Sequence, residues 1–391
     1  MITVDEALIL VESNCSALPV KAIALADSVG LVLAEEIISP INMPPFRQSA
    51  MDGYALNFSE EINSYKVIGE IAAGSSQKFE LKPGEAIRIF TGGSVPDSAN
   101  SIIQQELITK NDNSIQLNSP FSINQNIRKI GEQIKKGEIA LKKNIKLTPA
   151  AVGYIASLGI AEIKVIPNPK IALLNTGNEL TEPGKNLEDG KIFESNSLML
   201  DAALKSFHFY NLIKEKVIDQ LAETISSLKK LISENDIVLV SGGISVGDYD
   251  YVKKALESLG VKEIFYKVKQ KPGKPLFFGT VNNKLIFALP GNPAAALTCF
   301  YIYVLPALRK LSGNNFAGLK KSQLKLATDF SKKTGLAHFL KSISTNDSVT
   351  ILEGQSSAML QTFALANSIV YIPESVENLK SGDRVDVYLF D

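Results

Sequence analysis

The spacing of apolar residues changes along the chain, and the changes predict regions of different structure. Residues 3–13 carry apolar side chains on one helical face, and Thr3 and Glu6 have the spacing of a helix capping box. From about 50 to 130, short apolar runs alternate with clusters of glycine, proline, asparagine and serine, which indicates a β-rich insert. Helical spacing returns at 148–159, after a threonine suited to capping and with a proline suited to the first turn.

Between about 169 and 312, short apolar strands alternate with amphipathic helices, which is typical of a mainly parallel sheet covered by helices. One of these helices, 195–207, is expected to be capped by serine or asparagine. Two apolar runs around the sequence VNNK predict a hairpin within 275–289. The apolar segment 293–311 is predicted to be a long helix that bends near Pro306, after which the chain is β-rich again.

Composition limits the classes of function that the sequence allows. The chain has 391 residues, enough for several domains, and its 41 lysines and arginines balance 41 aspartates and glutamates. A net charge of zero gives no general attraction to nucleic acid or to an anionic membrane. The acidic amino end lacks the order of a signal peptide, and no uncharged apolar run of about 18 residues predicts a membrane span. We therefore expect a cytoplasmic protein.

Cysteine and histidine are scarce, which argues against a disulfide framework and against a zinc site. Cys15 and Cys299 both lie in helical, apolar contexts, so we expect them to be core residues. His208 lies within SFHFY and is expected to be a packed or surface histidine instead of a catalytic base.

Two loops that follow predicted strands carry acidic residues. In LLNTGNEL, Glu179 is either a surface acid or a carboxylate that points into a crevice. In VLVSGGISVGDYDYV, Gly242 and Gly243 allow the backbone to approach an anion, and Ser245 adds a hydroxyl donor. Asp250 lies where the next helix begins, and helix capping alone does not explain that loop. Because ligands bind outside the carboxyl ends of strands in open α/β sheets, both loops are candidates.

A basic loop and a helix start provide groups that attract anions. The segment YKVKQKPGKPLFF contains Lys267, Lys271 and Lys274, and its prolines stiffen what would otherwise be a solvated loop. The segment ALPGNPAAAL places a glycine turn and a helix start after another strand, which also favours an anion. Carboxylates near a bound phosphate require a cation between them, so we expect Mg²⁺. The glycine loops lack the spacing of a P-loop and of a dinucleotide-binding fingerprint.

Seven motifs are spread between residues 44 and 373. They are PPFRQSAMDGYAL, RIFTGGSVPDSANSIIQQE, NTGNEL, SGGISVGDYDYV, KQKPGKP, LPGNPAAAL and GQSSAMLQTFALANSIVYIP. Through these motifs the chain resembles the MoeA family, the molybdopterin molybdenumtransferases, which is also represented in the E domain of gephyrin. The resemblance implies a transferase of molybdenum cofactor biosynthesis that inserts molybdate into adenylylated molybdopterin and releases AMP with Mg²⁺ present.

The resemblance also implies the fold class and the domains. The fold class is a multidomain α/β protein with a central doubly wound domain like that of MogA. Residues 1–49 and 131–168 would form a split domain I, 50–130 the β-rich domain II, 169–315 the α/β molybdopterin-binding domain III, and 316–391 a C-terminal β-barrel, domain IV. The implied assembly is a homodimer with a composite active site, and other proteins of molybdenum cofactor synthesis are implied partners.

The resemblance assigns site residues position by position. The residues implied to be catalytic are Asp52, Thr91, Glu179, Asp219, Asp250, Lys267 and Lys271. The residues implied to bind substrate are Gly242, Gly243, Ser245, Lys274, Pro290, Asn292, Pro293, Lys341 and Ser357. Glu179 and Asp250 are implied to hold Mg²⁺, and Asp52 to complete the site of the partner subunit.

Three positions depart from the family pattern. Gln133 and Asn178 stand where aspartate is usual, and Lys341 stands where arginine is usual. Lysine keeps the positive charge, but it lacks the bidentate geometry with which arginine binds an oxyanion.

Other functions stay open at this point. A molybdopterin adenylyltransferase would need only a region like 169–312, which leaves the flanking β-rich regions without a role. A scaffold protein like gephyrin would add a long linker or a partner domain, and these residues contain neither. Tungstate has the charge and nearly the size of molybdate, so either oxyanion fits the sequence.

Overall fold

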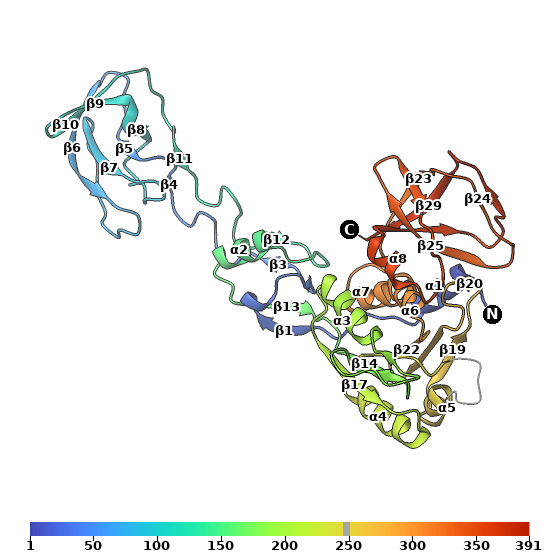
Figure 1. Ribbon diagram of the computed structural model, residues 1–391. Coiled ribbons are helices and arrows are strands. Elements are labelled where there is room, and N and C mark those ends of the chain that lie inside the picture. The colour runs from blue at the N-terminus through green and yellow to red at the C-terminus, as the bar shows by residue number, and fades with distance from the viewer. Residues whose placement is uncertain (245–250, 391) are drawn as a thin grey trace. The chain divides into compact units, whose positions relative to one another are not determined.

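The computed structural model describes residues 1–244 and 251–390, which form two compact units (Figure 1). Unit 1 comprises Met1–Ala22, Gly30–Val32 and Lys164–Asp391. Unit 2 comprises Ile23–Val29 and Leu33–Ile163. The four domain boundaries expected from the sequence are finer than this division and stay predictions.

A six-stranded sheet forms the centre of unit 1, with the strand order β17-β14-β18-β22-β21-β19. In this order the strands are Leu212–Val217, Ile171–Thr176, Ile237–Ser241, Lys284–Leu289, Phe277–Val281 and Lys262–Tyr266. The first four are parallel, whereas β21 runs antiparallel to both β22 and β19. Every residue of β14 and β18 is buried, because both faces of the sheet are covered.

Helices cover both faces of this sheet, as the alternation of strands and helices predicts. They are α3 (Asn196–Ser206), α4 (Leu221–Glu234), α5 (Tyr251–Ser258) and the long helical run after β22. Leu173 of β14 packs in one core with residues of α3 and of the long run, and Leu174 packs in the other core with residues of α4 and α5. Neighbouring residues of a strand point to opposite faces, so one strand serves two cores. The predicted doubly wound α/β domain is confirmed.

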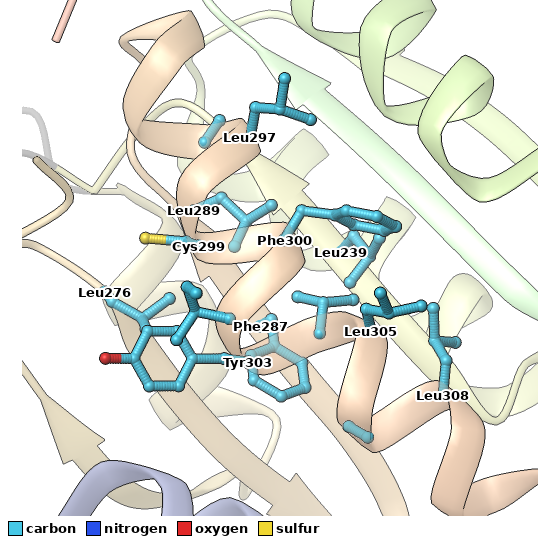
Figure 2. Close-up of a cluster of buried hydrophobic side chains, with 14 of the residues drawn as sticks. Leu239, Leu276, Phe287, Leu289, Leu297, Cys299, Phe300, Tyr303, Leu305 and Leu308 are labelled. Carbon is cyan, nitrogen blue, oxygen red and sulfur yellow. The ribbon is translucent and has the colours of Figure 1, made fainter. Parts of the chain in front are cut away.

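The predicted long helix is present as three joined segments, α6 (Pro293–Cys299), a π-helical turn (Phe300–Val304) and α7 (Leu305–Leu311). The π turn lies just before Pro306, whose nitrogen has no hydrogen to donate, so the change in hydrogen-bond register accommodates the proline. Figure 2 shows Phe300 and its neighbours packed among side chains of the central sheet. The run is long and apolar enough to cross a membrane, but 83% of its apolar window is buried inside the unit, as expected for a core helix.

The amino-terminal helix α1 (Val4–Ser13) begins as the sequence predicts. The Thr3 hydroxyl accepts a hydrogen bond from the Glu6 N–H at 3.2 Å, and the Glu6 carboxylate accepts one from the Thr3 N–H at 2.8 Å. The apolar face of α1 joins the core that contains α7. This packing places the first residues of the chain in unit 1.

Several smaller predictions are also confirmed. The hairpin between β21 and β22 turns at Asn282 and Asn283, whose φ angles of 48° and 62° suit asparagine. Cys15 and Cys299 are buried free thiols, and burial raises the pKa of each to about 12. His208 is exposed, and its Nδ1 lies 3.2 Å from the Tyr210 hydroxyl.

The C-terminal part of unit 1 contains a closed barrel of five strands, as expected. In ring order the strands are β25 (Ala337–Ser344), β26 (Ser348–Ile351), β23 (Lys320–Leu326), β29 (Arg384–Leu389) and β27 (Ser368–Ile372). The ring closes because β25 pairs with both β26 and β27. The smaller elements of this region are β20 (Gln270–Lys271), which pairs with β25, the strands β24 (Phe330–Ser331) and β28 (Asn378–Leu379), and α8 (Leu360–Leu365).

Unit 2 contains a second six-stranded sheet with the order β8-β5-β7-β6-β10-β9. In this order the strands are Ser101–Gln104, Gly53–Leu56, Glu85–Ile89, Ser64–Ile71, Ser114–Leu117 and Ile108–Asn111. Tyr54 and Leu56 pack in one core and Ala55 in another, so both faces of β5 are buried. This sheet is the β-rich insert that the sequence predicts.

Short elements account for the rest of the regular structure. They are the pairs β4 (Gln48–Ser49) with β11 (Ile127–Arg128) and β3 (Ile37–Ile38) with β12 (Ile139–Leu141), a sheet of β1 (Lys21–Ala24), β13 (Glu162–Ile166) and β2 (Val32–Leu33), helix α2 (Pro149–Ser157), and 3-10 turns at Leu25–Asp27 and Gln105–Leu107. Thr148 caps α2 as predicted, since its hydroxyl accepts a hydrogen bond from the Ala151 N–H at 3.2 Å.

Candidate active site

A cavity of about 540 Å³ lies in unit 1 at the carboxyl ends of β14, β18 and β22. Ligands bind at this edge of open α/β sheets. Its walls come from the loops after these strands, from the start of α3 and from the short parallel pair β15 (Leu180–Thr181) and β16 (Ile192–Phe193). The described lining residues are Asn175, Thr176, Glu179, Leu180, Ile192, Phe193, Glu194, Ser195, Asn196, Ser241, Gly242, Ile244, Pro275, Pro290, Gly291, Asn292, Pro293 and Ala358.

Glu179 follows β14, as predicted, and lies in the wall of this cavity. Its side chain is exposed, and its carboxylate has no hydrogen bond or ion pair to any described residue. The backbone beneath it is fixed, because the Ile192 N–H donates to the Glu179 carbonyl oxygen at 2.9 Å. The carboxylate is therefore available to a cation.

Asn178 and Asp219 meet beside this turn. The Asp219 N–H donates to Asn178 Oδ1 at 3.1 Å, and the Asp219 carboxylate accepts a hydrogen bond from the Thr176 hydroxyl. Asn178 thus keeps the acceptor that an aspartate would offer, without the charge. Asp219 contacts Thr176 of the cavity wall but is not itself among the described lining residues.

Gly242 and Gly243 follow β18 with φ angles of 91° and 66°, a region that favours glycine. A Cβ atom on Gly242 would lie 2.4 Å from the Thr176 carbonyl oxygen, and one on Gly243 would lie 2.6 Å from Val252 Cγ2. Both positions therefore require glycine, and Gly242 lines the cavity. Ser245 and Asp250, predicted in the same loop, lie outside the described residues.

Asn196, the first residue of α3, connects two of the loops that form the cavity. Its Nδ2 donates to the Ser241 hydroxyl at 2.9 Å and to the Gly291 carbonyl oxygen at 2.7 Å. Its Oδ1 is buried and has no hydrogen-bond partner among the described residues. The loops after β18 and β22 are thus held in one arrangement by a single amide.

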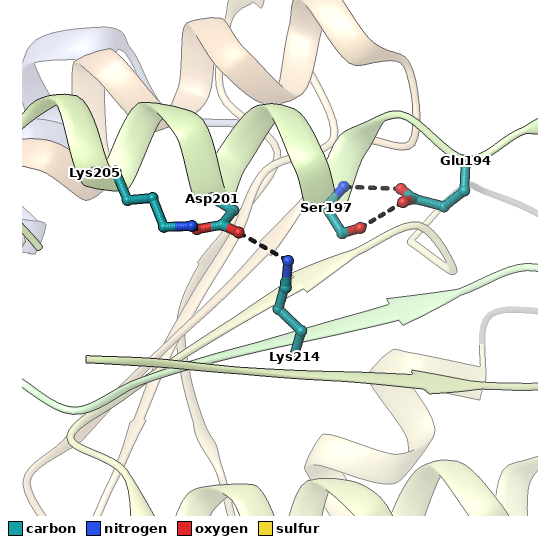
Figure 3. Close-up of polar contacts among 5 residues, drawn as sticks. All are labelled: Glu194, Ser197, Asp201, Lys205 and Lys214. Atoms are coloured by element: carbon teal, nitrogen blue, oxygen red, sulfur yellow. Dashed lines mark hydrogen bonds and ion pairs between the residues drawn. The ribbon is translucent and has the colours of Figure 1, made fainter. Parts of the chain in front are cut away.

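Glu194 holds the start of α3, and this corrects the expected cap by serine or asparagine. Figure 3 shows the Glu194 carboxylate accepting hydrogen bonds from the N–H of Ser197, at 2.8 Å, and from its hydroxyl. A carboxylate is favoured at a helix N-terminus because it compensates the positive end of the dipole. The sequence marks a cap near this point but does not show that the preceding glutamate takes the role.

Further along α3, Asp201 pairs with Lys205 and with Lys214 of β17 at 2.9 and 2.8 Å (Figure 3). Burial opposes ionisation of Asp201, but the two ammonium groups outweigh it and lower the pKa of the carboxyl. The helix is therefore fixed both at its start and against the edge strand of the sheet.

The helix-start loop after β22 lines the cavity through Pro290, Gly291, Asn292 and Pro293. Asn292 Nδ2 donates to the Ser357 hydroxyl at 2.9 Å, and the Ala294 N–H donates to the Ser357 carbonyl oxygen at 3.1 Å. The structure thus brings Ser357, which the resemblance implies to bind substrate, to this loop. It also shows that the first N–H groups of α6 already have acceptors within the protein.

A buried glutamine anchors the basic loop. Gln270 is fully buried, and its Nε2 donates to the carbonyl oxygens of Pro272 and Gly273 at 3.1 and 3.2 Å. The Tyr303 hydroxyl donates to its Oε1. Lys271 and Lys274 project from this held turn and are exposed, while Pro275 lies in the cavity wall.

Lys267 lies at the start of the basic loop with a φ angle of 71°, and its Nζ is 4.8 Å from the centroid of the Tyr266 ring. Such a contact stabilises the ammonium group against an aromatic face. None of the three predicted lysines of this loop is among the described lining residues of the cavity.

Asp52 and Thr91 form a hydrogen-bonded pair in unit 2. Asp52 Oδ1 accepts hydrogen bonds from the Thr91 N–H at 2.7 Å and from the Thr91 hydroxyl at 2.8 Å. These two hydrogen bonds lower the pKa of the Asp52 carboxyl, and the bond from the N–H has the larger effect. Arg88 stands nearby, donating to the Gly53 carbonyl oxygen at 3.3 Å.

Three family models match the chain in succession. The MoeA N-terminal region (domain I and II) matches residues 2–159, the model described as "Probable molybdopterin binding domain" matches 172–310, and the MoeA C-terminal region (domain IV) matches 323–390. The molybdopterin molybdenumtransferase of Haemophilus influenzae is 35% identical over 382 residues, which covers 94% of this chain and 93% of the relative. This chain belongs to the MoeA family.

Other MoeA proteins extend the match over the full length. The molybdopterin molybdenumtransferase of Staphylococcus aureus (strain COL) is 32% identical over 399 residues, covering 99% of this chain and 95% of the relative. Among solved structures, a molybdopterin biosynthesis MoeA protein from Pyrococcus horikoshii has a TM-score of 0.82 at 29% identity and covers 100% of this chain and 99% of its own. The fold and the order of the regions are therefore those of MoeA.

Lys341 is the position at which the resemblance leads us to expect arginine, and the structure shows the contacts that the lysine makes. Its side chain is only 3% exposed, and its Nζ donates to the carbonyl oxygens of Gly354, Ser356 and Met359 at 2.8, 3.1 and 3.1 Å. An ammonium group has three hydrogens, so these acceptors use all of them. Burial lowers the pKa of Lys341. This geometry supports a positioning role, in which Lys341 fixes the segment that brings Ala358 to the cavity.

Gln133, another of the three positions expected to depart from the family pattern, lies in unit 2, where its N–H donates to the Met43 carbonyl oxygen at 2.9 Å. The structure gives its side chain no part in the cavity. The residues that sequence reasoning missed are Glu194, Asn196 and Gln270, each of which holds a loop that forms or flanks the site. Their signal is weak, because their partners are mainly backbone atoms.

Proposed function

We propose that this protein is a molybdopterin molybdenumtransferase, which inserts molybdate into adenylylated molybdopterin and releases AMP. Its relatives from H. influenzae and S. aureus carry the name molybdopterin molybdenumtransferase. The structural observation that carries the proposal is the cavity of about 540 Å³ at the carboxyl ends of the parallel strands. This volume suits a ligand of this kind, since binding pockets commonly measure about 300–1,000 Å³.

The chemistry of the walls supports an anionic, polar substrate. Asn196, Asn292 and Ser241 lie in the wall and carry no negative charge. Gly242 lines the cavity without a side chain, which would leave its backbone open to a bound anion. Glu179 is an acid of the wall with an unpartnered carboxylate, so the cavity has a place for one cation beside the anions.

The residues present fit Mg²⁺. This ion is commonly held by one or two carboxylates together with phosphate oxygens and water. Glu179 would supply one carboxylate, and Asp250 stays a predicted second ligand. Within residues 1–244 and 251–390 no group of three His, Cys, Asp or Glu side chains could hold a metal. When bound, the ion would neutralise phosphate charge.

The remaining predicted residues are assigned by the same proposal. Lys271 and Lys274, which flank the turn next to Pro275, would supply positive charge to molybdate or phosphate, and Lys267 would add a third positive charge. Pro290 and Pro293 shape the loop that presents Asn292, and Ser357 holds that loop from the C-terminal region. Asp52, ordered by Thr91, would complete the site of a partner subunit in a cytoplasmic homodimer.

The reaction itself tests the proposal. Purified protein is mixed with adenylylated molybdopterin, Mg²⁺ and molybdate, and the release of AMP is followed over time. We expect release that depends on molybdate and stops when the metal is chelated, and a parallel reaction with tungstate shows whether that oxyanion is also accepted. Absence of molybdate-dependent release would contradict the proposal, and formation of pyrophosphate from ATP and free molybdopterin would favour an adenylyltransferase instead.

A further inference from the structure

Phe193 is an aromatic side chain that the fold leaves in contact with solvent inside the cavity. It is 45% exposed and lies in the cavity wall. It makes no ring contact with another described aromatic residue, and it is the single aromatic among the described lining residues. An apolar ring exposed in the wall of a cavity is available to contact a ligand.

The backbone at Phe193 is held firmly although the ring is free. Phe193 pairs with Thr181 in the short parallel ladder of β15 and β16. On either side of it, the Ile192 N–H donates to the Glu179 carbonyl oxygen at 2.9 Å and the Glu194 N–H donates to the Thr181 carbonyl oxygen at 2.8 Å. Glu194 in turn anchors the start of α3. The ring is thus carried on a fixed platform that also carries Glu179.

A polar group without a partner lies in the same cavity. Asn175, at the end of β14, is 5% exposed and lines the cavity, and its side-chain amide has no hydrogen bond to any described residue. A primary amide offers both donors and an acceptor in one plane. The edge of a nitrogen heterocycle offers the same combination, and burial without such a partner is unfavourable.

We propose that Phe193 and Asn175 form a subsite for the planar nitrogen heterocycle of the substrate. The ring system stacks on the face of Phe193, and an edge of the ligand supplies hydrogen bonds to the Asn175 amide. This inference rests on the proposed function, because it names which part of the substrate this wall binds. Adenine and the pterin share the required chemistry, so both are tested as ligands.

The absence of tryptophan from the chain gives a direct test. Phe193→Trp places one tryptophan in the cavity wall, where stacking of a ring quenches its fluorescence. Tyr210→Trp serves as the matched control, because Tyr210 is 66% exposed in the same unit and does not line the cavity. The probes are AMP alone and 6-hydroxymethylpterin alone, titrated against each variant without molybdate or Mg²⁺.

Saturable quenching of Phe193→Trp by either probe, with only a linear loss in Tyr210→Trp, is the expected result. Quenching by AMP alone places the adenine on Phe193, and quenching by the pterin alone places the other ring system there. Equal, non-saturable behaviour of both variants with both probes would overturn the subsite. Because these measurements need no turnover, they separate failure of the subsite from failure of the proposed reaction.

Affinity measurements by calorimetry extend the test to the native residue. Base stacking on an aromatic side chain is usually worth a factor of about ten or more in affinity, so Phe193→Ala should weaken binding of the stacked probe about tenfold. Phe193→Tyr keeps a stacking face and should bind nearly as the native protein does, and Asn175→Ala should weaken binding by a smaller factor of about three to ten. Equal affinity in native protein and Phe193→Ala would overturn the stacking role.

Discussion

Two acidic turns, one in each unit, differ in how their carboxylates are held. In unit 2, Asp52 accepts two hydrogen bonds from Thr91 at 2.7 and 2.8 Å, so its carboxylate is ordered within the protein itself. In unit 1, Glu179 lies in the cavity wall with no partner for its carboxylate among the described residues. The carboxylate of Asp52 is thus oriented by the protein, whereas the carboxylate of Glu179 is available to a ligand. The two residues should therefore respond differently to substitution.

The largest effect is expected from Glu179→Gln. If this carboxylate holds the cation at the phosphates, its neutral isostere should reduce AMP release by about a hundredfold or more, since the charge at the metal is lost. The thermal midpoint should stay unchanged, because the carboxylate makes no hydrogen bond or ion pair with any described residue. Glu182→Gln is the matched control: Glu182 is an exposed acid paired with Lys185 at 2.7 Å and outside the cavity, so its loss should leave turnover intact. Equal activity of the two variants would remove Glu179 from the site.

Asp52 should show a smaller loss of activity together with a shift in titration. Asp52→Ala is expected to lower AMP release about ten- to a hundredfold. Thr91→Val removes the hydroxyl but keeps the N–H, which is the larger cause of the lowered Asp52 pKa. The pKa of Asp52 should therefore rise towards its usual range without reaching it, and NMR titration of the carboxyl measures this. An unchanged Asp52 pKa in Thr91→Val would show that the hydroxyl does not order the acid.

A comparison of two lysines separates positioning from direct contact. Lys341→Met leaves three carbonyl oxygens without their donor, so the free energy of unfolding should fall by about 2 kcal/mol, partly offset by removal of a buried charge. Lys274→Met removes an exposed lysine and should leave the free energy of unfolding unchanged while weakening turnover. Chemical denaturation of both variants checks this. Full stability of Lys341→Met would show that its three hydrogen bonds do not hold segment 354–359.

The smallest expected effect concerns His338 in β25, which lies opposite Lys271 of β20 in the strand pairing. Burial is the largest cause of the lowered pKa of His338, and the positive charges of Lys332 and Lys271 add to it. Together they lower this pKa from 6.5 to about 4. Between these values the unfolded chain binds more protons than the folded one, so stability falls as the pH drops from 6.5 towards 4. After a discount for partial exposure, the loss should be roughly 1–2 kcal/mol. In His338→Gln this part of the pH dependence of unfolding should disappear, and an unchanged slope would contradict it.

The sequence predicts the parts of this molecule that depend on local chemistry. A few neighbouring residues are enough to predict each of these parts. They are the capping box of Thr3 and Glu6, the Asn282–Asn283 turn and the alternating strands and helices. The glycines of the loop after β18 could also be found, because their spacing marks a close backbone approach, here to Thr176.

The features that the sequence does not predict depend on contacts between residues that are far apart in the chain. Asn196 donates a hydrogen bond to the Gly291 carbonyl oxygen, and Lys341 donates to the carbonyl oxygens of Gly354 and Met359. These contacts join residues that are distant in the sequence, so the roles of Asn196 and Lys341 can be seen only in the folded chain. Glu194 was missed because capping by the residue before a serine has no strong local pattern. The exposure of Phe193 in the cavity is likewise visible only in the folded chain, because the sequence predicts that an aromatic residue beside an isoleucine is buried in the core.

Whether the two acidic turns serve one active site is tested by mixing Asp52→Ala with Glu179→Ala and measuring AMP release. Each variant alone should retain about a tenth of the native activity or less. In a two-fold dimer whose sites combine Asp52 of one copy with Glu179 of the other, each hybrid dimer contains one intact site, so about a quarter of the native activity should return after random exchange. No recovery, once exchange of tagged subunits has been demonstrated, would contradict a site shared between two copies of the chain.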